Sequence, residues 1–573
     1  MDSEKLKRLI DAAAGRRPVD LLLENARLLN VFTAKTERTS IAIADGYVVG
    51  FCAQEARRKM DLEDRFVAPG LIDAHVHLES SLTCPAEYAR AVVPRGTAAV
   101  VADPHEIANV LGRDGIDYML RASEDLPLDV YLALPSCVPA TSMETAGARL
   151  EARDLAPLLE HPRVVALAEM MNFPGVIAAD ADVLAKIAAA GRAGKPVDGH
   201  APGLEGQGLQ AYLAAGIASD HECTTAAEAY EKLAAGMHVM IRQGTGARNL
   251  DDLVEIVNQR TCHRIMLCTD DRHPHHLMEE GHMDALVRQA ISRGVDPVTA
   301  VRMATLNPAE YFGLRHLGAV APGRRADLVI LDDLEKFQVS RVFHAGRQVA
   351  AAGKLEPDLE PGARPAAPSP MRIDARSVDF RIAAGGRRIR VIQVTDGRIV
   401  TGSLVAEAAV ERGQAVSDPA RDLLKLAVIE RYQGSGQMGM GFVRGFGLKR
   451  GALASTVAHD SHNLVVVGAD DEDMRLAVAG LVEMGGGLMA VEGGRVLAEL
   501  DLPLAGLMSP EPLETVRRCL DDLLAAARSL DCVLSDPFMS LSFLALPVIP
   551  ELKLTDKGLV DVTVFRPVSL FVD

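Results

Sequence analysis

The 573-residue sequence contains no tryptophan, and aromatic residues make up only 4% of it. It also has no C-x-x-C pair among its eight scattered cysteines, which are Cys52, Cys84, Cys137, Cys223, Cys262, Cys268, Cys519 and Cys532. In a long chain without a secretory signal, such cysteines are typical of reduced, mostly buried side chains. The spacing excludes a zinc ribbon. It also argues against the cytidine-type zinc deaminases, which need a P-C-x-x-C segment.

Basic residues and long apolar runs are scarce as well. The chain has 61 Lys and Arg against 78 Asp and Glu, a net charge of −17. Nucleic acids require clustered basic side chains, so we expect a small neutral or cationic substrate and no nucleic-acid partner. No stretch approaches the roughly 20 apolar residues of a membrane span, and residues 1–17 lack the apolar centre of a signal peptide. We therefore expect a soluble, cytoplasmic protein without a membrane partner.

Eight short apolar runs are present in the first 270 residues, and each ends on a side chain that can bind a metal or carry a proton. The runs are Leu71–His77, Ala98–Asp103, Val130–Ser136, Val164–Glu169, Val197–His200, Ile217–His221, Val239–Arg242 and Ile265–Asp270. Such runs are typical of buried parallel strands, and their alternation with helical stretches predicts an α/β fold, a (β/α)8 TIM-type barrel. In that fold the carboxyl ends of all eight strands face one cup, where catalytic groups lie.

The chain is too long for a single core, so further domains are expected around the barrel. The predicted organisation is an N-terminal helix and first part of a flanking discontinuous β-sandwich at 1–67, the barrel at 68–314, the second part of the sandwich at 315–354, a Pro-rich linker at 355–370 and an additional C-terminal α+β domain at 371–573. Five prolines in the linker disfavour both helix and central strand.

Within the C-terminal region, Ile389–Val394 and Leu464–Val467 read as strands. A hairpin is expected around Gly493 and Gly494, because paired glycines mark tight turns. The segments Pro419–Glu430 and Leu513–Ala526 are expected to be helices.

The first strand ends on His75 and His77. Alternate side chains of a strand share a face, so both imidazoles project into the cup and can bind one divalent ion. An H-x-H pair alone is weak evidence, and any single polar strand end could be a helix cap or a rim residue. The other strand ends that carry potential ligands are Glu169, His200, His221 and Asp270. Six coincidences at five strand ends predict a two-metal site.

These motifs resemble the amidohydrolase superfamily and, within it, the bacterial adenine deaminases. The motifs are GLIDAHVHLESS at 70–81, DPHE at 103–106, AEMMN at 168–172, GHAP at 199–202, DHE at 220–222, TDDR at 269–272, GFGLKRG at 445–451 and AHDSHN at 458–463. The resemblance covers nearly the whole chain. Tyr432 departs from the family pattern, which commonly has His at this position, and this puts substrate preference in question.

The resemblance implies a binuclear metal centre. It implies His75, His77 and Asp270 as ligands of one ion, His200 and His221 as ligands of the second, and Glu169 as the bridge. Many superfamily members use a carboxylated lysine as the bridge, which a glutamate makes unnecessary. Nitrogen and oxygen ligands without thiolate suit Zn, Mn or Fe, and the resemblance favours Mn or Fe.

Two such ions lower the pKa of a shared water from about 15.7 towards neutrality, so that it can attack C6 of adenine. The leaving amine must be protonated, and we assign the proton shuttle to Asp270, with Glu169 assisting. Candidate substrate contacts, each with an alternative as a turn former or helix cap, are Glu79, Ser80, Ser81, Asp103, His105, Glu106 and Arg242. Asp271, Glu222 and 272–276 are expected to be supporting or solvated groups.

The polar group His459, Asp460, His462 and Asn463 precedes an apolar run in the C-terminal region. Such a group is typical of a turn or capped loop. The alternative is that it closes over the barrel mouth of its own or a neighbouring subunit.

Three functions remain open from the sequence. The first is hydrolytic deamination of adenine to hypoxanthine and ammonia, in purine salvage. The second keeps the metal site and acts on another 6-substituted purine or a cyclic amide, since one fold supports many chemistries. The third is a metal-loaded but inactive scaffold whose C-terminal domain regulates or assembles. A flanking sandwich and an extra domain around a barrel also lead us to expect a homo-oligomer, a dimer or larger.

Overall fold

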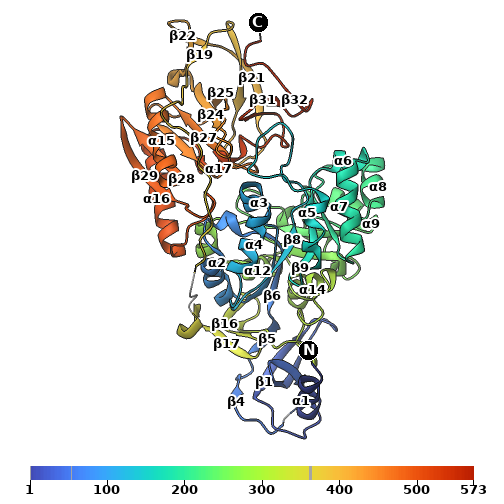
Figure 1. The fold of residues 1–573 in the computed structure, drawn as a ribbon. Coiled ribbons are helices and arrows are strands. Elements are labelled where there is room, and N and C mark those ends of the chain that lie inside the picture. The colour runs from blue at the N-terminus through green and yellow to red at the C-terminus, as the bar shows by residue number, and fades with distance from the viewer. Residues whose placement is uncertain (1, 53, 360–363, 573) are drawn as a thin grey trace.

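The structure, a computed structural model, describes residues 2–52, 54–359 and 364–572. Figure 1 shows three regions in succession: a sheet near the N-terminus, a central barrel, and a C-terminal region on the opposite side of the barrel. Among the described residues, no helix is both long and apolar enough to cross a membrane.

The central region is the predicted barrel of parallel strands. Its strands are β6 (Leu71–His77), β7 (Thr97–Ala102), β8 (Asp129–Leu134), β9 (Val164–Met170), β10 (Val197–Gly199), β11 (Ser219–Asp220), β12 (His238–Arg242), β13 (Ile265–Cys268) and β14 (Asp270–Asp271). Parallel pairing runs from β6 to β10, a bridge between Val197 and Ile217 continues it, and β11 pairs with β12 and β12 with β13. Pairing of β14 with β6 closes the barrel, so β13 and β14 together are the eighth strand.

Helices surround this barrel between successive strands. The principal ones are α2 (Pro85–Val92), α3 (His105–Leu111), α4 (Arg113–Ala122), α7 (Ala181–Arg192), α8 (Gly206–Ala214), α9 (Ala226–Ala234), α12 (Met283–Ser292), α13 (Pro297–Met303) and α14 (Leu306–Tyr311). Apolar side chains on both faces of the strands bury the sheet completely, which is why the strands read as continuous apolar runs.

A register irregularity in β6 determines which side chains reach the cup. Ile72 and Ala74 pack inside the barrel, whereas Val76 packs against the outer helices. The pairing with β7 shifts between Asp73 and Val76, so the inward positions change from even to odd numbers. This change turns His75 inward, as bulges commonly do when they re-aim side chains. A similar shift against β10 affects β9 between Leu167 and Met170.

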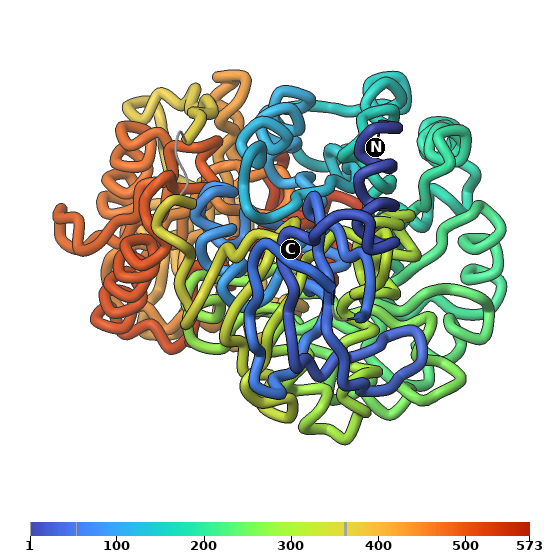
Figure 2. Tube along the Cα trace, turned by 90° about the horizontal axis from the view of Figure 1, so that it is seen from below, coloured from blue at the N-terminus to red at the C-terminus, as the bar shows by residue number. Residues whose placement is uncertain are grey.

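The segments before and after the barrel share one sheet. Its strands, in order, are β18 (Lys354–Leu355), β17 (Arg347–Ala351), β16 (Gln338–His344), β15 (Leu328–Asp333), β5 (Phe66–Pro69), β1 (Leu21–Asn30), β2 (Lys35–Ala44) and β3 (Tyr47–Gly50), with β4 (Lys59–Asp61) beside β1. Pairing of β5 with β15 joins the two segments, which lie side by side in Figure 2. Side chains from both segments form one apolar cluster, so the two segments share a core as well as a sheet. The helix α1 (Ser3–Ala13) packs against it.

The C-terminal region is built on an eight-stranded mixed sheet. Its order is β21 (Gly402–Glu407), β20 (Arg388–Gln393), β25 (Met438–Arg444), β24 (Leu424–Ile429), β27 (Leu464–Gly468), β26 (Ala452–Ser455), β28 (Gly487–Glu492) and β29 (Arg495–Asp501). The helix α15 (Asp471–Met484) packs on one face, and α16 (Leu513–Ser529) and α17 (Pro537–Phe543) pack on the other. The predicted hairpin is the turn between β28 and β29.

The predicted helix at Pro419–Glu430 is wrong. Pro419–Arg421 form one 3-10 turn, and the rest of the segment is the central strand β24. Leu424, Leu426 and Val428 face one apolar cluster, while Ala427 and Ile429 face another. A run buried on both faces has no polar side that would distinguish strand from helix, so periodicity could not decide.

The expected Pro-rich linker begins with some regular structure, because β18 ends at Leu355 and a 3-10 turn spans Pro357–Leu359. Residues 364–370 have no helix or strand. Pro361 lies outside the described residues.

Candidate metal centre and active site

The structure brings the six predicted ligands together in the cup. Their imidazole nitrogens and carboxylate oxygens belong to overlapping groups whose ligand atoms lie within 4.8 Å of one another. Glu169 is at the centre. Its Oε2 lies 2.6 Å from His200 Nδ1 and 3.2 Å from His221 Nε2. Its Oε1 lies 3.4 Å from His77 Nε2 and 3.8 Å from His75 Nε2. One carboxylate oxygen thus faces each histidine pair.

Asp270 completes the side of the cup that holds the first pair. Its Oδ1 lies 3.1 Å from His77 Nε2 and 3.5 Å from His75 Nε2. The backbone of Asp270 is left-handed, with φ of 57°, at the break between β13 and β14. This conformation is uncommon for a residue with a side chain and clusters at functional sites.

Two buried carboxylates keep their charge in this site. Burial alone would raise the pKa of Asp270, but the Arg242 guanidinium and the two nearby imidazoles hold that pKa well below its usual range. Burial opposes ionisation of Glu169 in the same way, and its hydrogen bond to His200 and the other imidazoles hold its pKa well below normal. Both groups are therefore available as anionic oxygen donors.

The orientation of His77 is fixed from outside the cup. Its Nδ1 lies 3.0 Å from the main-chain oxygen of Asp103, so the Nδ1–H donates there. The lone pair is then on Nε2, which faces Glu169 and Asp270. Metal-binding imidazoles are usually oriented by such a bond on the other ring nitrogen.

The donor set fits divalent metal ions. Two carboxylates and four imidazoles converge without a thiol. All six groups are buried except His200, which is partly exposed. Buried carboxylates in such proximity require compensating positive charge. Zn, Mn and Fe all accept nitrogen and oxygen ligands of this kind.

Glu222, which the sequence assigned to a supporting position, also lies beside the second histidine pair. Its Oε1 lies 3.5 Å from His221 Nε2 and 3.8 Å from His200 Nδ1. Glu222 and Asp270 both contact the Nη1 atom of Arg242, which lies 2.6 Å from Asp270 Oδ2. Arg242, a candidate substrate contact, is thus already engaged by two carboxylates.

The candidates just after the first strand hold the loop together. Ser81 Oγ donates to the main-chain oxygen of Leu78 at 2.7 Å, and Ser80 Oγ donates to Asp271 Oδ1 at 2.5 Å. Glu79 Oε1 accepts the main-chain N–H of Ile107 at 3.2 Å, at the start of α3. Burial raises the pKa of Glu79 to about 7. The side chains of Glu79 and Ser81 are thus engaged by main-chain groups of Ile107 and Leu78.

The candidates after the second strand lie next to the predicted metal ligands. His105 Nδ1 lies 3.0 Å from Asp103 Oδ2 and 3.5 Å from Glu169 Oε1. On the other edge of the ring, His105 Nε2 lies 3.4 Å from Glu106 Oε1. Asp103, His105 and Glu106 therefore form a buried row that leads away from Glu169.

That row meets a loop of the C-terminal region, which closes on the barrel of its own chain. His459 Nδ1 lies 2.6 Å from Glu106 Oε1, and His462 Nε2 contacts Glu106 Oε2. Asn463 Nδ2 donates to the main-chain oxygen of Thr145 at 2.7 Å. The sequence left two interpretations of this loop, a capped turn or a segment that closes over the barrel mouth, and these contacts agree with the second. The sequence feature that suggested this contact is the pair of histidines and the carboxylate within AHDSHN at 458–463.

Tyr432 supports the same loop. Its buried hydroxyl donates to the main-chain oxygen of Ser461 and lies 3.1 Å from that of His462. The residue that departs from the family pattern thus contacts the loop backbone, at one remove from the cup.

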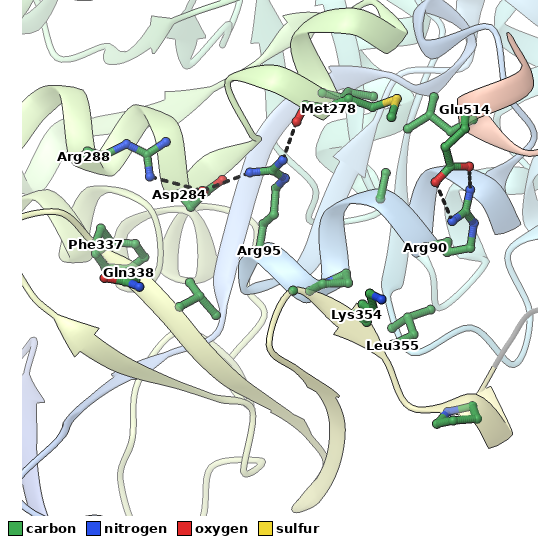
Figure 3. A pocket seen from close by; sticks show the side chains of 17 residues that line it. Arg90, Arg95, Met278, Asp284, Arg288, Phe337, Gln338, Lys354, Leu355 and Glu514 are labelled. Carbon is green, nitrogen blue, oxygen red and sulfur yellow. Dashed lines mark hydrogen bonds and ion pairs between the residues drawn. The ribbon is translucent and has the colours of Figure 1, made fainter. Parts of the chain in front are cut away.

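A cavity of about 720 Å³ lies outside the cup, and none of the six predicted ligands lines it. Figure 3 shows ion pairs among its charged side chains: Arg90 contacts Glu514, and Arg95 and Arg288 both contact Asp284. A cavity of about 290 Å³ lies between the barrel and the C-terminal region, lined by His275 and His276 on one side and by Phe543 on the other. Of these two cavities, the one of about 290 Å³ adjoins the loops that follow strands β12 and β14 of the barrel.

Comparison with known proteins gives matches over both halves of the chain. The model of the amidohydrolase family matches residues 66–349, and that of the adenine deaminase C-terminal domain matches residues 398–566. A protein of Desulfatibacillum aliphaticivorans named adenine deaminase is 56% identical over 98% of this chain and 99% of its own length. One of Methanothrix thermoacetophila with the same name is 51% identical over 99% of this chain and 100% of its own. The solved structure of an enamidase covers 60% of this chain and 98% of its own, with 17% identity and a TM-score of 0.46.

Proposed function

Because this chain belongs to the adenine deaminase family of amidohydrolases, we propose that it hydrolyses adenine to hypoxanthine and ammonia. The observation that carries the proposal is the position of Glu169, whose two oxygens face separate histidine pairs. Such an arrangement suits two divalent ions held side by side.

The distances support the ligand roles that the sequence motifs suggest. His75 and His77 would hold one ion with Asp270, His200 and His221 would hold the other, and Glu169 would bridge them. The buried carboxylates compensate the charge of the ions. Mn or Fe is our proposal for the resident metal, and the donor set also accepts Zn. When bound, two such ions lower the pKa of a water molecule and polarise it for addition to an electron-poor ring carbon.

Asp270 is our candidate for the group that moves the proton. Its Oδ1 faces the histidine pair, while Oδ2 is held by Arg242 at 2.6 Å. The carboxylate can accept the water proton at Oδ1 and deliver it to the amine that leaves from C6. Arg242 keeps the carboxylate ionised and limits its rotation.

The buried row beyond Glu169 would border the purine ring. Asp103 and His105 offer hydrogen-bonding groups there, while both carboxylate oxygens of Glu106 are taken up by His459 and His462. Unpaired buried polar groups discriminate strongly against analogues that cannot satisfy them. We therefore assign substrate selection to this side of the cup, together with Ser80.

The test is release of ammonia by Mn-loaded enzyme from adenine, adenosine, other 6-substituted purines and cyclic amides, with product identified by chromatography. Hypoxanthine from adenine supports the proposal. Ammonia from another purine alone, or ring opening of a cyclic amide, contradicts the assignment of adenine. Absence of turnover with two bound metal equivalents would favour the inactive scaffold.

Three further expectations belong to this proposal. A role in purine salvage follows from the reaction, and a cytoplasmic location agrees with reduced cysteines. A homo-oligomer, a dimer or larger, is expected, and light scattering of the purified protein measures it.

A further inference from the structure

A second group of potential metal ligands lies at the contact between the barrel and the C-terminal region. It consists of Glu106, at the start of α3, and His459 and His462, in the loop between β26 and β27. All three side chains are buried. His459 Nδ1 lies 2.6 Å from one carboxylate oxygen of Glu106, and His462 Nε2 contacts the other. The ligands come from points more than 350 residues apart in the sequence.

A fourth group at this contact has an unused oxygen. Asp460 is 3% exposed, and its Oδ2 is buried without a hydrogen-bond partner among the described residues. Its Oδ1 lies 3.9 Å from His105 Nε2. Buried polar atoms are nearly always paired, and an ion or a water molecule is one explanation for an unpaired carboxylate oxygen. Asp460 therefore offers an oxygen that a cation at this contact can use.

Two carboxylates, Glu106 and Asp460, are buried at this point. The buried guanidinium of Arg431 is close to the loop, but it donates to the main-chain oxygens of His462, Pro370 and Ala505. It therefore serves the backbone of the loop, while the two carboxylates face histidines. Buried carboxylates without a paired cation are costly.

We propose that Glu106, His459 and His462 form a third site for a divalent transition-metal ion, with Asp460 supplying a further oxygen. Two imidazoles and carboxylate oxygens without sulfur suit Zn, Mn or Fe. His105 separates this site from the six-ligand centre, because its Nδ1 faces Glu169 and its Nε2 faces Glu106. The ion clamps the C-terminal loop onto the barrel mouth. The competing arrangement is a histidine–glutamate–histidine clasp held by hydrogen bonds alone.

A double variant, His459→Asn with His462→Gln, distinguishes the metal site from the arrangement held by hydrogen bonds alone. The amide nitrogen of Asn can occupy the place of Nδ1, and that of Gln the place of Nε2, so both can still donate to Glu106. Amides bind transition metals far more weakly than imidazoles. The full-length protein is saturated with Mn or Zn, desalted, and its metal measured by mass spectrometry. We expect one equivalent per chain fewer in the double variant than in the unaltered protein. The exposed His263→Gln is the control and keeps the full content.

Equal metal content in the folded double variant and the unaltered protein would overturn the third site and support the clasp. Circular dichroism establishes folding. Should the double variant not fold, the unaltered protein decides alone: three equivalents per chain support the site and two refute it. The result is separable from the proposed reaction. Adenine turnover with only two equivalents leaves that reaction intact, and three equivalents without turnover contradict only the reaction.

Discussion

Arg242 Nη1 lies 2.6 Å from Asp270 Oδ2, and the same nitrogen contacts Glu222. Two carboxylates from different strand ends thus share one guanidinium at the edge of the cup. The contact leaves Asp270 Oδ1 as the oxygen that faces the histidine pair. The arrangement gives Asp270 a fixed geometry and an anionic state, which a proton shuttle next to a metal centre needs.

Asp270→Asn is expected to lower kcat for adenine by about 10³-fold or more, because an amide cannot accept and release the proton. Five of the six ligands remain, so most of the metal is expected to stay bound. Steady-state kinetics and metal analysis of the same preparation measure both. The exposed Asp251→Asn is a control that keeps full activity. Near-normal turnover by Asp270→Asn would remove the shuttle from this residue.

His200→Ala is expected to lose the second ion. His200 Nδ1 makes the shortest contact of the Glu169 carboxylate among the described residues, at 2.6 Å, and its loss leaves His221 as the one imidazole of this pair. Metal analysis should show about one equivalent fewer than in the unaltered protein, together with loss of deamination. The same metal content and activity as in a His263→Ala control would exclude His200 as a ligand.

Tyr432→Phe tests whether the loop over the cup is held from the C-terminal sheet. The change removes a buried hydroxyl that donates to the main chain at Ser461 and His462. The oxygen of His462 keeps Arg431 as a donor, but that of Ser461 loses its donor, and leaving a buried acceptor unpaired costs about 1–3 kcal/mol. We expect a lower thermal midpoint and a several-fold lower kcat/KM for adenine. The exposed Tyr230→Phe should change neither quantity. An unchanged kcat/KM with a lowered midpoint would restrict Tyr432 to a stabilising role.

Lys553 makes the stability of the protein dependent on pH. The ammonium is fully buried, donates to the main-chain oxygens of Ile399 and Phe543, and burial lowers its pKa to about 7. Between pH 7 and the ordinary lysine pKa of about 10.4, the unfolded chain binds a proton that the folded chain does not, so stability rises with pH.

The measurement compares unaltered protein with Lys553→Met by urea denaturation at pH 7 and pH 9. The free energy of unfolding of the unaltered protein should rise by about 2 kcal/mol relative to the variant over this interval. Other titrating groups contribute equally to both proteins, so their effect cancels when the two free energies of unfolding are subtracted. Lys7→Met, a change at an exposed lysine, is the control and should show no such pH-dependent difference. A constant difference between the two pH values would show that Lys553 does not titrate in this range.

Local patterns were enough for the barrel and for the residues at its mouth. Most positions of the barrel strands are apolar, and polar side chains such as Glu169 and Asp270, which we predict to be metal ligands, stand at or near the carboxyl ends. The same property misled the prediction at Pro419–Glu430, where a doubly buried strand has no polar face. Short apolar runs are ambiguous by periodicity alone.

The sequence by itself determined which chemical groups stand at the strand ends. Each apolar run and the polar residue that ends it are neighbours in the chain, so a local pattern is enough to find them. Only the tertiary structure decided how they meet: that β6 changes its inward face to aim His75, that Arg242 is taken up by Asp270 and Glu222, and that His459 and His462 reach Glu106. Those contacts join segments up to more than 350 residues apart, and no local pattern encodes which distant partner a buried charge will find.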